Sequence, residues 1–157
     1  TITHIAAKQV GEKAFTVLPH VKITQDDRNC LVINAPTISD ETIVTNDIVE
    51  IVNDHQFVFL GRIDNVINSG GIKLIPEQIE EKLSGKINAR YFVTGVPDTA
   101  LGEKLVLVIE GEKQPIDDAI FDSLDKYQKP KEIIFVPQFK ETENGKIIRK
   151  KSYLYKL

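Results

Sequence analysis

The segment Gly61–Glu80 constrains the fold more than any other stretch, because the sequence pattern changes across it. Before it, short runs rich in β-branched residues alternate with polar turn clusters, which is typical of an antiparallel sheet. After it, apolar residues at helical spacing alternate with strand-like runs. The segment itself holds a double glycine and, at Pro76, a residue that suits the first position of a helix. We therefore predict two structural units, residues 1–63 and residues 64–157.

The first unit, residues 1–63, is predicted to be a small antiparallel β-subdomain, a sheet or barrel fragment. Apolar runs on either side of polar turn clusters indicate two hairpins. Their strands are Val21–Thr24 with Cys30–Asn34, and Asp47–Val52 with Gln56–Leu60. Residues 1–20 carry only a weak pattern and are expected to be poorly ordered without neighbouring chain. Four such short strands bury too little surface for a complete core, so this unit needs further chain to cover it.

The second unit, residues 64–157, is predicted to be a compact α+β domain in which helices cover a sheet. The run Leu105–Ile109 is almost wholly apolar, so we expect it at the centre of that sheet. The other expected elements are a hairpin over Asn65–Ile75, a helix from Pro76 to Gly85, strands Tyr91–Val96 and Glu132–Val136, a helix from Pro115 with Ile116, Ala119, Ile120 and Leu124 on its inner face, and a final amphipathic helix toward Leu157. The fold class of the whole chain is therefore α+β.

Composition excludes several classes of protein. Hydrophobic residues make up 41% and charged residues 27% of the chain, as in a folded globular protein rather than a disordered one. No apolar run approaches the roughly 18 residues that a membrane helix needs, so no membrane span is expected. The lone cysteine, Cys30, allows no internal disulfide and favours a reducing compartment such as the cytoplasm. The histidines are scattered, and no metal site is predicted in this chain.

Two turns contain residues that could carry chemistry. Lys146 follows Asn-Gly at a tight turn, so its side chain could reach a phosphate or a carboxylate as a mobile positive charge. Gly70 and Gly71 could let the backbone approach a ligand closely, with Lys73 beside them. From the local pattern alone, an ordinary surface turn is the commoner explanation in both cases.

Asp47 and Arg62 form a third candidate. One predicted strand begins at Asp47 and its partner ends at Arg62, so the two side chains are expected at the same end of the hairpin. A carboxylate there could accept hydrogen bonds from ribose hydroxyls while the arginine donates beside it. An exposed salt bridge, worth less than about 1 kcal/mol, explains the pair equally well. The local sequence leaves both interpretations open.

Each short motif is a weak signal alone, but the order of the motifs along the chain is specific. In sequence they are Thr45-Asn-Asp-Ile-Val, Gly61-Arg-Ile-Asp-Asn-Val-Ile, Ser69-Gly-Gly-Ile-Lys, Pro76-Glu-Gln-Ile-Glu, Gly95-Val-Pro-Asp, Leu101-Gly-Glu, Lys129-Pro and Thr142-Glu-Asn-Gly-Lys-Ile-Ile-Arg. This series closely resembles the C-terminal third of the adenylate-forming superfamily, which comprises acyl- and aryl-CoA ligases, amino-acid adenylation domains and luciferases. Within that family, Thr1–Ala6 and Leu31–Pro36 look most like the ligases that act on o-succinylbenzoate in menaquinone synthesis.

The resemblance implies an activity and a set of roles. Enzymes of this family form an acyl-adenylate from a carboxylic acid and Mg-ATP, release pyrophosphate, and then pass the acyl group to coenzyme A. By resemblance, Asp47 would hold the ribose hydroxyls with support from Arg62, and Phe59 would lie beside the nucleotide. Asp64 would be the hinge between the units. Lys146 would bridge the carboxylate of the acid and the α-phosphate during adenylation.

The same resemblance places Gly70 and Gly71 along the tunnel for the pantetheine arm of coenzyme A, with Lys73 nearby, after the small domain rotates. Three positions depart from the usual family pattern. Gln78 replaces a glutamate, Asn68 replaces a frequent lysine, and Lys140 replaces a common proline. None of these changes removes a residue to which the resemblance gives a catalytic role.

The family's Ser/Thr/Gly-rich ATP loop and its Thr-Glu motif, which helps to hold Mg²⁺, do not occur in these 157 residues. The chain also begins at Thr1 and contains no methionine. We therefore expect a piece of a longer ligase, whose partner is the missing N-terminal part of the same polypeptide, and we expect no activity from this piece alone.

Two other functions fit the sequence. A stand-alone binding or regulatory module could keep the fold without catalysis. The stretch from Thr142 to Leu157 is rich in basic residues, which raises the possibility of a nucleic-acid binder, but only Tyr153 and Tyr155 could stack on bases there. Since a basic patch beside an ATP site explains the same residues, we expect a small-molecule carboxylic acid and no nucleic acid as partner.

Overall fold

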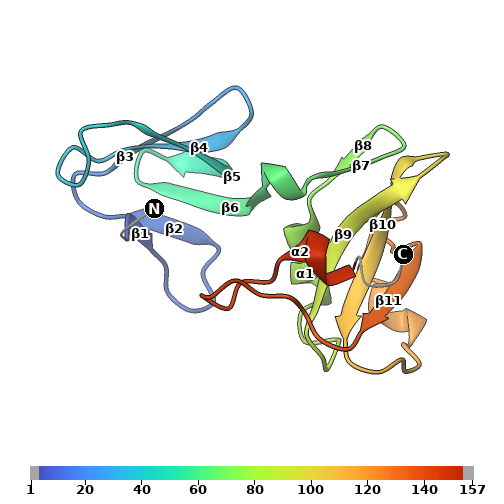
Figure 1. Cartoon of the computed structure of the whole chain (residues 1–157). Coiled ribbons are helices and arrows are strands. Elements are labelled where there is room, and N and C mark those ends of the chain that lie inside the picture. The colour runs from blue at the N-terminus through green and yellow to red at the C-terminus, as the bar shows by residue number, and fades with distance from the viewer. Residues whose placement is uncertain (1–3, 154–157) are drawn as a thin grey trace. The chain divides into compact units, whose positions relative to one another are not determined.

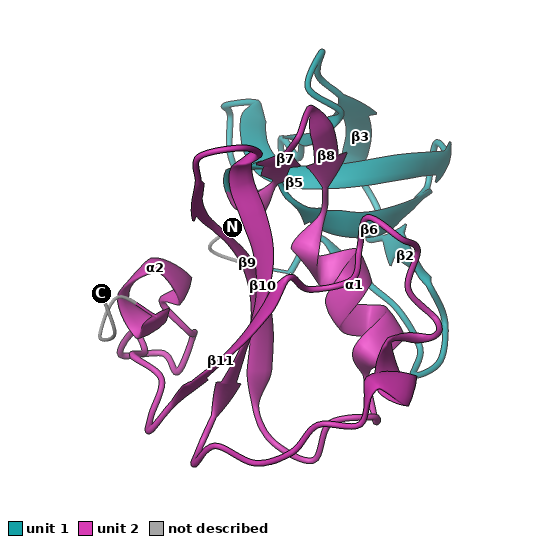
Figure 2. Ribbon diagram, turned by 90° about the vertical axis from the view of Figure 1, so that its right-hand side faces the viewer, with its two compact units in different colours: residues 1–64 teal, residues 65–157 magenta. Residues whose placement is uncertain are grey.

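The structure, a computed structural model, describes residues 4–153. The chain divides into two compact units, unit 1 with residues 1–64 and unit 2 with residues 65–157 (Figure 2). Unit 1 is built on an antiparallel sheet, and unit 2 combines a second sheet with short helices. The predicted α+β fold class is confirmed.

Within the described part of unit 1, six strands form one antiparallel sheet in the order β1-β2-β6-β5-β4-β3 (Figure 1). Their bounds are β1 Ala6–Ala7, β2 Ala14–Val17, β3 Lys22–Gln25, β4 Cys30–Asn34, β5 Ile43–Asn53 and β6 Gln56–Arg62. Both predicted hairpins are confirmed, as β3–β4 and β5–β6. One face of the sheet buries an apolar cluster that includes Leu31, Ile33, Val49 and Phe57.

The expectation of poor order for residues 1–20 is wrong for the residues that the structure describes. β2 pairs with β6 and sets Phe15 opposite Phe57, where the two rings stack with centroids 5.4 Å apart. Val17 is buried in the same apolar cluster. A strand of four residues has a weak local pattern, and this one is fixed by pairing with a strand about forty residues later. Its existence therefore depends on a contact that a local pattern does not reveal.

In unit 2, the sheet is organised around β10 (Gly102–Glu110), as the apolar run predicted. β10 pairs antiparallel with β9 (Tyr91–Asp98) and parallel with β11 (Glu132–Val136). β7 (Ile67–Ser69) and β8 (Ile72–Leu74) form the predicted hairpin and join the sheet through a single pair at the start of β10. The residues Leu105–Ile109 are at most 1% exposed, because their side chains alternate between two apolar clusters on opposite faces of the sheet.

Short helices lie on the two sides of this sheet (Figure 2). α1 (Pro76–Leu83) begins with its proline as predicted, and its Ile79 and Leu83 are buried in one cluster with Leu107. The helix ends before Gly85, whose φ of 75° is left-handed. α2 (Arg149–Tyr153) packs its Tyr153 against the other cluster, and the remainder of the predicted final helix lies outside the described residues. The 3₁₀ helix η1 (Ile63–Asn65) spans the boundary between the units.

The predicted helix from Pro115 is wrong. The structure has only the short 3₁₀ helix η2 (Asp118–Phe121), and Ala119 is exposed rather than facing inward. The Asp117 side chain accepts a hydrogen bond from the backbone N–H of Ala119 at 2.9 Å. Aspartate and serine recur through this segment, and their side chains compete for backbone groups that a helix would use. Apolar packing survives without the helix, since Phe121 and Leu124 are still buried.

Leu107→Ala should lower the free energy of unfolding of unit 2 by about 2–5 kcal/mol, because it leaves a cavity beside the fully buried central strand. All four tyrosines lie beyond residue 64, so tyrosine fluorescence during urea unfolding reports on unit 2. Lys113→Ala, at an exposed position of the same unit, should stay within about 0.5 kcal/mol of the unchanged chain. A loss below about 1 kcal/mol for Leu107→Ala would contradict the central place of β10.

Candidate functional site

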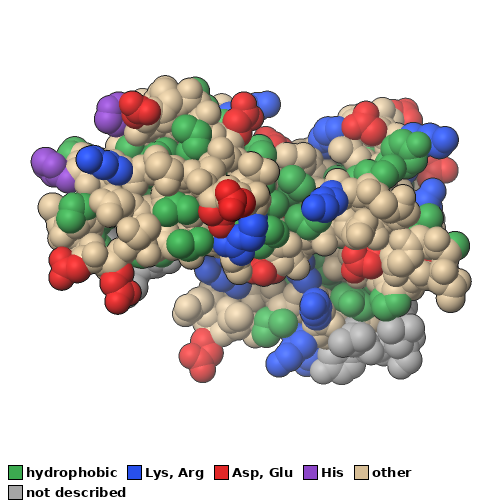
Figure 3. Space-filling model, turned by 90° about the horizontal axis from the view of Figure 1, so that it is seen from above, with side chains coloured by type: hydrophobic (Ala, Val, Ile, Leu, Met, Phe, Trp, Pro, Cys, Tyr) green, Lys and Arg blue, Asp and Glu red, His purple; other side chains and the backbone are tan. Residues whose placement is uncertain are grey.

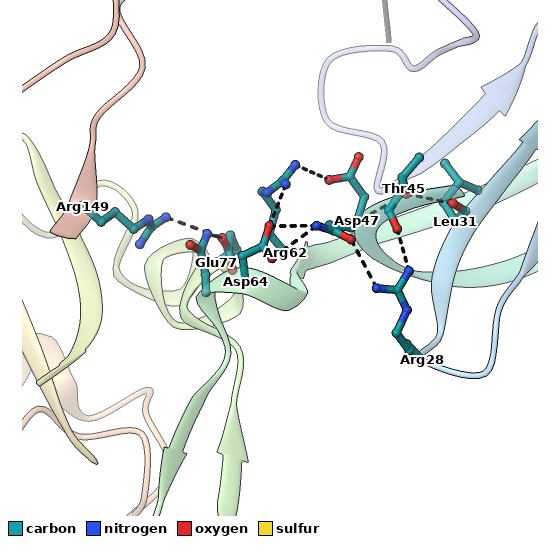
Figure 4. A network of polar contacts seen from close by, with 10 residues as sticks. Arg28, Leu31, Thr45, Asp47, Arg62, Asp64, Glu77 and Arg149 are labelled. Carbon is teal, nitrogen blue, oxygen red and sulfur yellow. Dashed lines mark hydrogen bonds and ion pairs between the residues drawn. The ribbon is translucent and has the colours of Figure 1, made fainter. Parts of the chain in front are cut away.

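The first group of predicted site residues lies at the end of the β5–β6 hairpin. Asp47 and Arg62 are opposite each other in the strand register, as expected from the sequence. Arg62 Nη1 donates to Asp47 Oδ1 at 3.0 Å, and Arg62 Nη2 donates to Asp64 Oδ2 at 2.9 Å (Figure 4). One guanidinium therefore connects the carboxylate proposed to hold ribose with the residue proposed as hinge.

Two residues that the sequence did not single out complete this network. Asn46 Nδ2 lies 3.2 and 3.1 Å from the two carboxylate oxygens of Asp64. Arg28 Nη1 donates to Asn46 Oδ1 at 3.3 Å, so the amide presents its NH₂ group to Asp64. Asn46 comes directly before Asp47 in the motif Thr45-Asn-Asp-Ile-Val, so that motif could have indicated it. Arg28 lies in the turn before β4, and its place beside Asn46 depends on how the strands of the sheet pair.

The electrostatics of this network favour charged Asp64. The hydrogen bond from Arg62, and next that from Asn46, hold the pKa of the Asp64 carboxyl below its ordinary value. The side chains of Arg62 and Asp64 are 47% and 53% exposed, so their ion pair contributes at most about 1 kcal/mol to folding. The network orients side chains more than it stabilises the fold.

Phe59 lies on β6, the strand that ends at Arg62, and it is 40% exposed. An exposed aromatic ring on a rigid strand offers a flat apolar surface. The position is suited to stacking against a planar ring such as a nucleotide base.

The second group is the β7–β8 turn. Gly70 and Gly71 have φ values of 59° and 83°, both in the left-handed region that glycine enters without strain. Gly70 N–H donates to the carbonyl oxygen of Leu101 at 2.8 Å, and a Cβ at Gly70 would lie 3.2 Å from Leu101 Cδ2. A Cβ at Gly71 would meet no described atom within 4 Å. Lys73 extends from β8 and is exposed.

The third group is the turn around Lys146. Thr142 N–H donates to the Lys146 carbonyl at 2.8 Å, and Lys146 N–H donates to Thr142 Oγ1 at 3.1 Å. Gly145 has a left-handed φ of 74°, and an isolated bridge joins Glu141 to Ile147. These contacts close a tight turn that leaves Lys146 exposed, as the sequence predicted.

Within unit 2, the structure does not bring the second and third groups together. The β7–β8 hairpin and the segment leading into α2 lie well apart in both Figure 1 and Figure 2. The site residues of this unit are therefore presented on two separate turns of one sheet-based scaffold.

A cluster of charged residues beyond Lys146 was also missed. Arg149 Nη2 donates to Glu80 Oε2 at 3.0 Å, and its Nη1 pairs with Glu80 Oε1 and donates to the Val93 carbonyl at 2.7 Å. Glu80 Oε1 also accepts from Val93 N–H at 2.7 Å. Glu77 Oε1 lies 3.6 Å from Arg149 and accepts from Asn65 Nδ2 at 2.5 Å (Figure 4). Arg149 and Glu80 both lie in quoted motifs, but nothing in the motifs indicated that they meet.

No group of three or more His, Cys, Asp or Glu side chains within residues 4–153 is arranged to hold a metal ion. No helix within the same range is long and apolar enough to cross a membrane. A pocket of about 410 Å³ is lined by Phe121, Pro130, Ile133 and four charged residues. None of the predicted site residues lines that pocket, so it is separate from the three groups described above.

Arg62→Met should raise the pKa of Asp64 toward its ordinary value, because the arginine hydrogen bond is the largest cause of the lowered pKa. Since the folded pKa is the lower one, the contribution of Asp64 to stability is present above about pH 4 and is lost as pH falls through the folded pKa. A carboxyl-carbon NMR titration measures this midpoint. Asp98 is the control, because backbone N–H groups of Leu101 and Ala100 lower its pKa. An Asp64 midpoint that stays unchanged would contradict the assigned cause.

Known proteins resemble this chain over part of their length. No protein-family model matches it. The 3-oxocholest-4-en-26-oate–CoA ligase of Rhodococcus rhodochrous is 32% identical over 112 residues, which are 66% of this chain and 20% of that ligase. The chain thus spans about a fifth of the length of the curated relatives that it matches.

Solved structures cover more of the chain. The acyl-CoA synthetase (AMP-forming)/AMP-acid ligase II-like protein of Dyadobacter fermentans is 32% identical with a TM-score of 0.55, covering 98% of this chain and 47% of that one. Escherichia coli MenE with bound OSB-AMS is similar in fold, at a TM-score of 0.69 and 24% identity, covering 89% of this chain and 34% of MenE. The homologues and structural neighbours of this chain are thus AMP-forming acyl-CoA synthetases.

Proposed function

We propose that this chain is the C-terminal portion of an ATP-dependent acid–CoA ligase. Residues 1–63 would be the last β-subdomain of the large adenylation domain, and residues 64–157 the mobile C-terminal domain. The observation that carries the proposal is the match to an AMP-forming synthetase-like protein over 98% of this chain at 32% identity. The partner of the chain would be the N-terminal part of the same polypeptide, and the chain alone would be inactive.

The proposed reaction has two steps. A carboxylate oxygen of the acid attacks the α-phosphorus of ATP, which forms an acyl-adenylate and releases pyrophosphate. The thiol sulfur of coenzyme A then attacks the acyl carbon, and AMP leaves. We assign the Mg²⁺ that accompanies ATP to ligands in the N-terminal part, and the presence of ATP and coenzyme A as substrates fits a cytoplasmic enzyme.

In this proposal unit 1 holds the nucleotide. Arg62 fixes the Asp47 carboxylate through the 3.0 Å hydrogen bond, so that Asp47 can accept hydrogen bonds from the ribose hydroxyls. The exposed ring of Phe59 would lie against the nucleotide. Asp64, at the boundary between the units, would be the hinge residue whose backbone takes up the rotation.

Unit 2 would serve the two steps with its two separate turns. During adenylation, the ammonium group of Lys146 would stabilise the charge that develops on the carboxylate and α-phosphate oxygens. After rotation, Gly70 and Gly71 would line the pantetheine tunnel, with Lys73 nearby. Because these turns lie apart on one scaffold, a rigid rotation could exchange one for the other, which is how hinged domains change a site lining.

We propose o-succinylbenzoate of menaquinone synthesis as the acid. Support comes from the resemblance of Thr1–Ala6 and Leu31–Pro36 to that subfamily and from the fold likeness to MenE, which binds OSB-AMS. The relative from Rhodococcus rhodochrous is named for 3-oxocholest-4-en-26-oate, so that acid is the natural comparison in a substrate panel.

A stand-alone binding or regulatory module with the same fold is the alternative. The joint presence of Asp47, Arg62 and Lys146 favours the enzyme, since a module without catalysis has no need of all three. A Ser/Thr/Gly-rich ATP loop encoded upstream of Thr1 would support the ligase, and a start codon directly before Thr1 would support the module. A nucleic-acid binder is disfavoured, because Tyr153 and Tyr155 are the only aromatic residues that could stack on bases within the basic stretch from Thr142 to Leu157. Figure 3 shows acidic as well as basic side chains on the face that it draws.

In the full-length protein, Lys146→Ala should slow acyl-adenylate formation by about 10²–10³-fold, because one preorganised donor is lost from the transition state. Thioester formation from a supplied acyl-adenylate should be largely spared. Rapid-quench assays of the two half-reactions measure both rates.

Replacing Gly71 with a bulky residue should do the reverse in the same protein: adenylation is largely spared and thioester formation is slowed. The turn requires the left-handed φ of 83°, and the side chain would stand where the pantetheine arm is proposed to pass. If Lys146→Ala and the Gly71 variant damage the same half-reaction, the assignment of one turn to each step is wrong.

A further inference from the structure

The segment that carries Lys146 has little regular structure of its own. Between β11 and α2 its strand pairing is the single bridge Glu141–Ile147, within the described residues. α2 itself is only five residues long. Backbone hydrogen bonds of the described chain, such as those from Thr142 N–H to the Lys146 carbonyl and from Ile148 N–H to the Lys140 carbonyl, join the segment only to itself. Contacts made by its side chains therefore decide how firmly it is held to the rest of unit 2.

Side chains do hold both ends of this segment. Before the turn, Arg90 pairs with Glu141 and lies 3.3 Å from Glu110. After the turn, Ser152 Oγ accepts from Lys140 N–H at 3.0 Å and donates to the Ile148 carbonyl at 2.9 Å. These contacts close the segment on itself, and Arg90 links it to the sheet.

Two further residues connect this segment to the body of unit 2: buried Phe139, whose ring packs against Phe92, and Arg149, three residues after Lys146. Of these two, Arg149 makes the polar connection. Its guanidinium forms a two-pronged pair with the carboxylate of Glu80 on α1 and also binds the Val93 carbonyl on β9. It lies 5.6 Å from the ring centroid of Phe92. Arg149 and Glu80 are 21% and 22% exposed, whereas Arg90 is 51% exposed. The more buried pair is less screened by solvent, so it holds its geometry more firmly.

Charge also favours a fixed position for Arg149. Glu77 adds a second carboxylate 3.6 Å from the guanidinium, and its Oε2 is buried with no hydrogen-bond partner among the described residues. Two largely buried acids thus face one arginine. Withdrawal of Arg149 would remove the ion pair that it makes with each of these two acids, which makes alternative positions of this segment costly.

From this geometry we propose that Arg149 and Glu80 are positioning residues for Lys146. They fix the turn to α1 and β9, so that the Lys146 ammonium group is delivered to one place during adenylation. The inference rests on the proposed function. It goes beyond that function by giving a specific task to a pair of residues to which the proposed function assigns no contact with substrate.

Arg149→Met tests the structural half of the inference in this chain. The amides of Thr142, Gly145 and Lys146, which close the turn, should exchange with solvent at least about tenfold faster by NMR. Lys104→Met is the matched control, because it removes a 2.8 Å ion pair with Glu132 at an exposed site of the same unit and should leave these amides unchanged. Unchanged exchange in Arg149→Met would overturn the inference.

The catalytic half is tested in the full-length protein. Arg149→Met should slow adenylate formation by about 10- to 100-fold through kcat, with KM for ATP within about twofold, because a displaced catalytic group loses transition-state contacts. Thioester formation from supplied acyl-adenylate should stay within about twofold. Arg149→Lys should be intermediate, since lysine keeps the charge but lacks the forked donor.

Glu80→Gln keeps the side-chain volume and an acceptor for Val93 N–H, so it replaces Arg149→Met if that variant does not fold. Glu80→Gln should likewise speed amide exchange in the turn and slow adenylate formation. Normal adenylation in a variant whose turn is loosened would overturn the positioning role and leave the proposed function intact, provided that Lys146→Ala still blocks the step. Equal loss in both half-reactions would mark general damage and overturn the inference. An unaffected Lys146→Ala enzyme would overturn both proposals.

Discussion

The pairing of Arg149 with Glu80 is the interaction on which the arrangement of unit 2 around Lys146 depends. Within the described residues, the segment after β11 has one isolated bridge and a helix of five residues, so secondary structure does little to place it. The guanidinium bonds to a helix side chain and to a strand carbonyl at once. An exposed ion pair contributes about 0–1 kcal/mol, whereas loss of one partner from a buried pair costs about 3–5 kcal/mol. At about one-fifth exposure, this pair lies nearer the second case.

The polar network of unit 1 has a different character. Arg62 connects Asp47 with Asp64, and Asn46 binds both carboxylate oxygens of Asp64. The side chains of Asp47, Arg62 and Asp64 are about one-third to one-half exposed. Such contacts orient groups at little cost and can rearrange when a ligand or a rotation changes their partners. A firmly held turn in one unit and an exchangeable network in the other fit the proposed enzyme, in which Lys146 would be a preformed catalytic group and Asp64 the hinge.

Local sequence patterns predicted the elements that depend on local forces. The apolar run of β10, the proline that starts α1, and the hairpins with polar turns were all found where expected. The helix from Pro115 failed because apolar spacing was given more weight than the aspartates that capture backbone N–H groups. β2 was missed because pairing with the distant strand β6, rather than propensity, creates it, and β1 in turn pairs with β2.

The candidate site also contains some contacts that a local sequence pattern predicts and others that it does not. Asp47 and Arg62 could be placed together because a hairpin register fixes which residues are opposite each other. Glu80 and Arg149 could not, since 69 residues separate them and their contact depends on how α1 and the last segment pack on β9. Arg28, just before β4, meets Asn46 on β5 because these two strands pair, with a register shift between Cys30 and Val32. Contacts of this kind come from tertiary packing, which a motif does not contain.

The central claim is that Arg149 acts through Lys146, and a double-mutant cycle on the rate of adenylate formation in the full-length protein tests it most directly. The cycle compares Arg149→Met in the natural background with the same change in a Lys146→Ala background. Residues that act as one unit have non-additive effects, so we predict that Arg149→Met slows adenylation alone but adds almost nothing once Lys146 is gone. If Arg149→Met lowers the rate of adenylate formation by the same factor in both backgrounds, Arg149 acts independently of Lys146, and the account is contradicted.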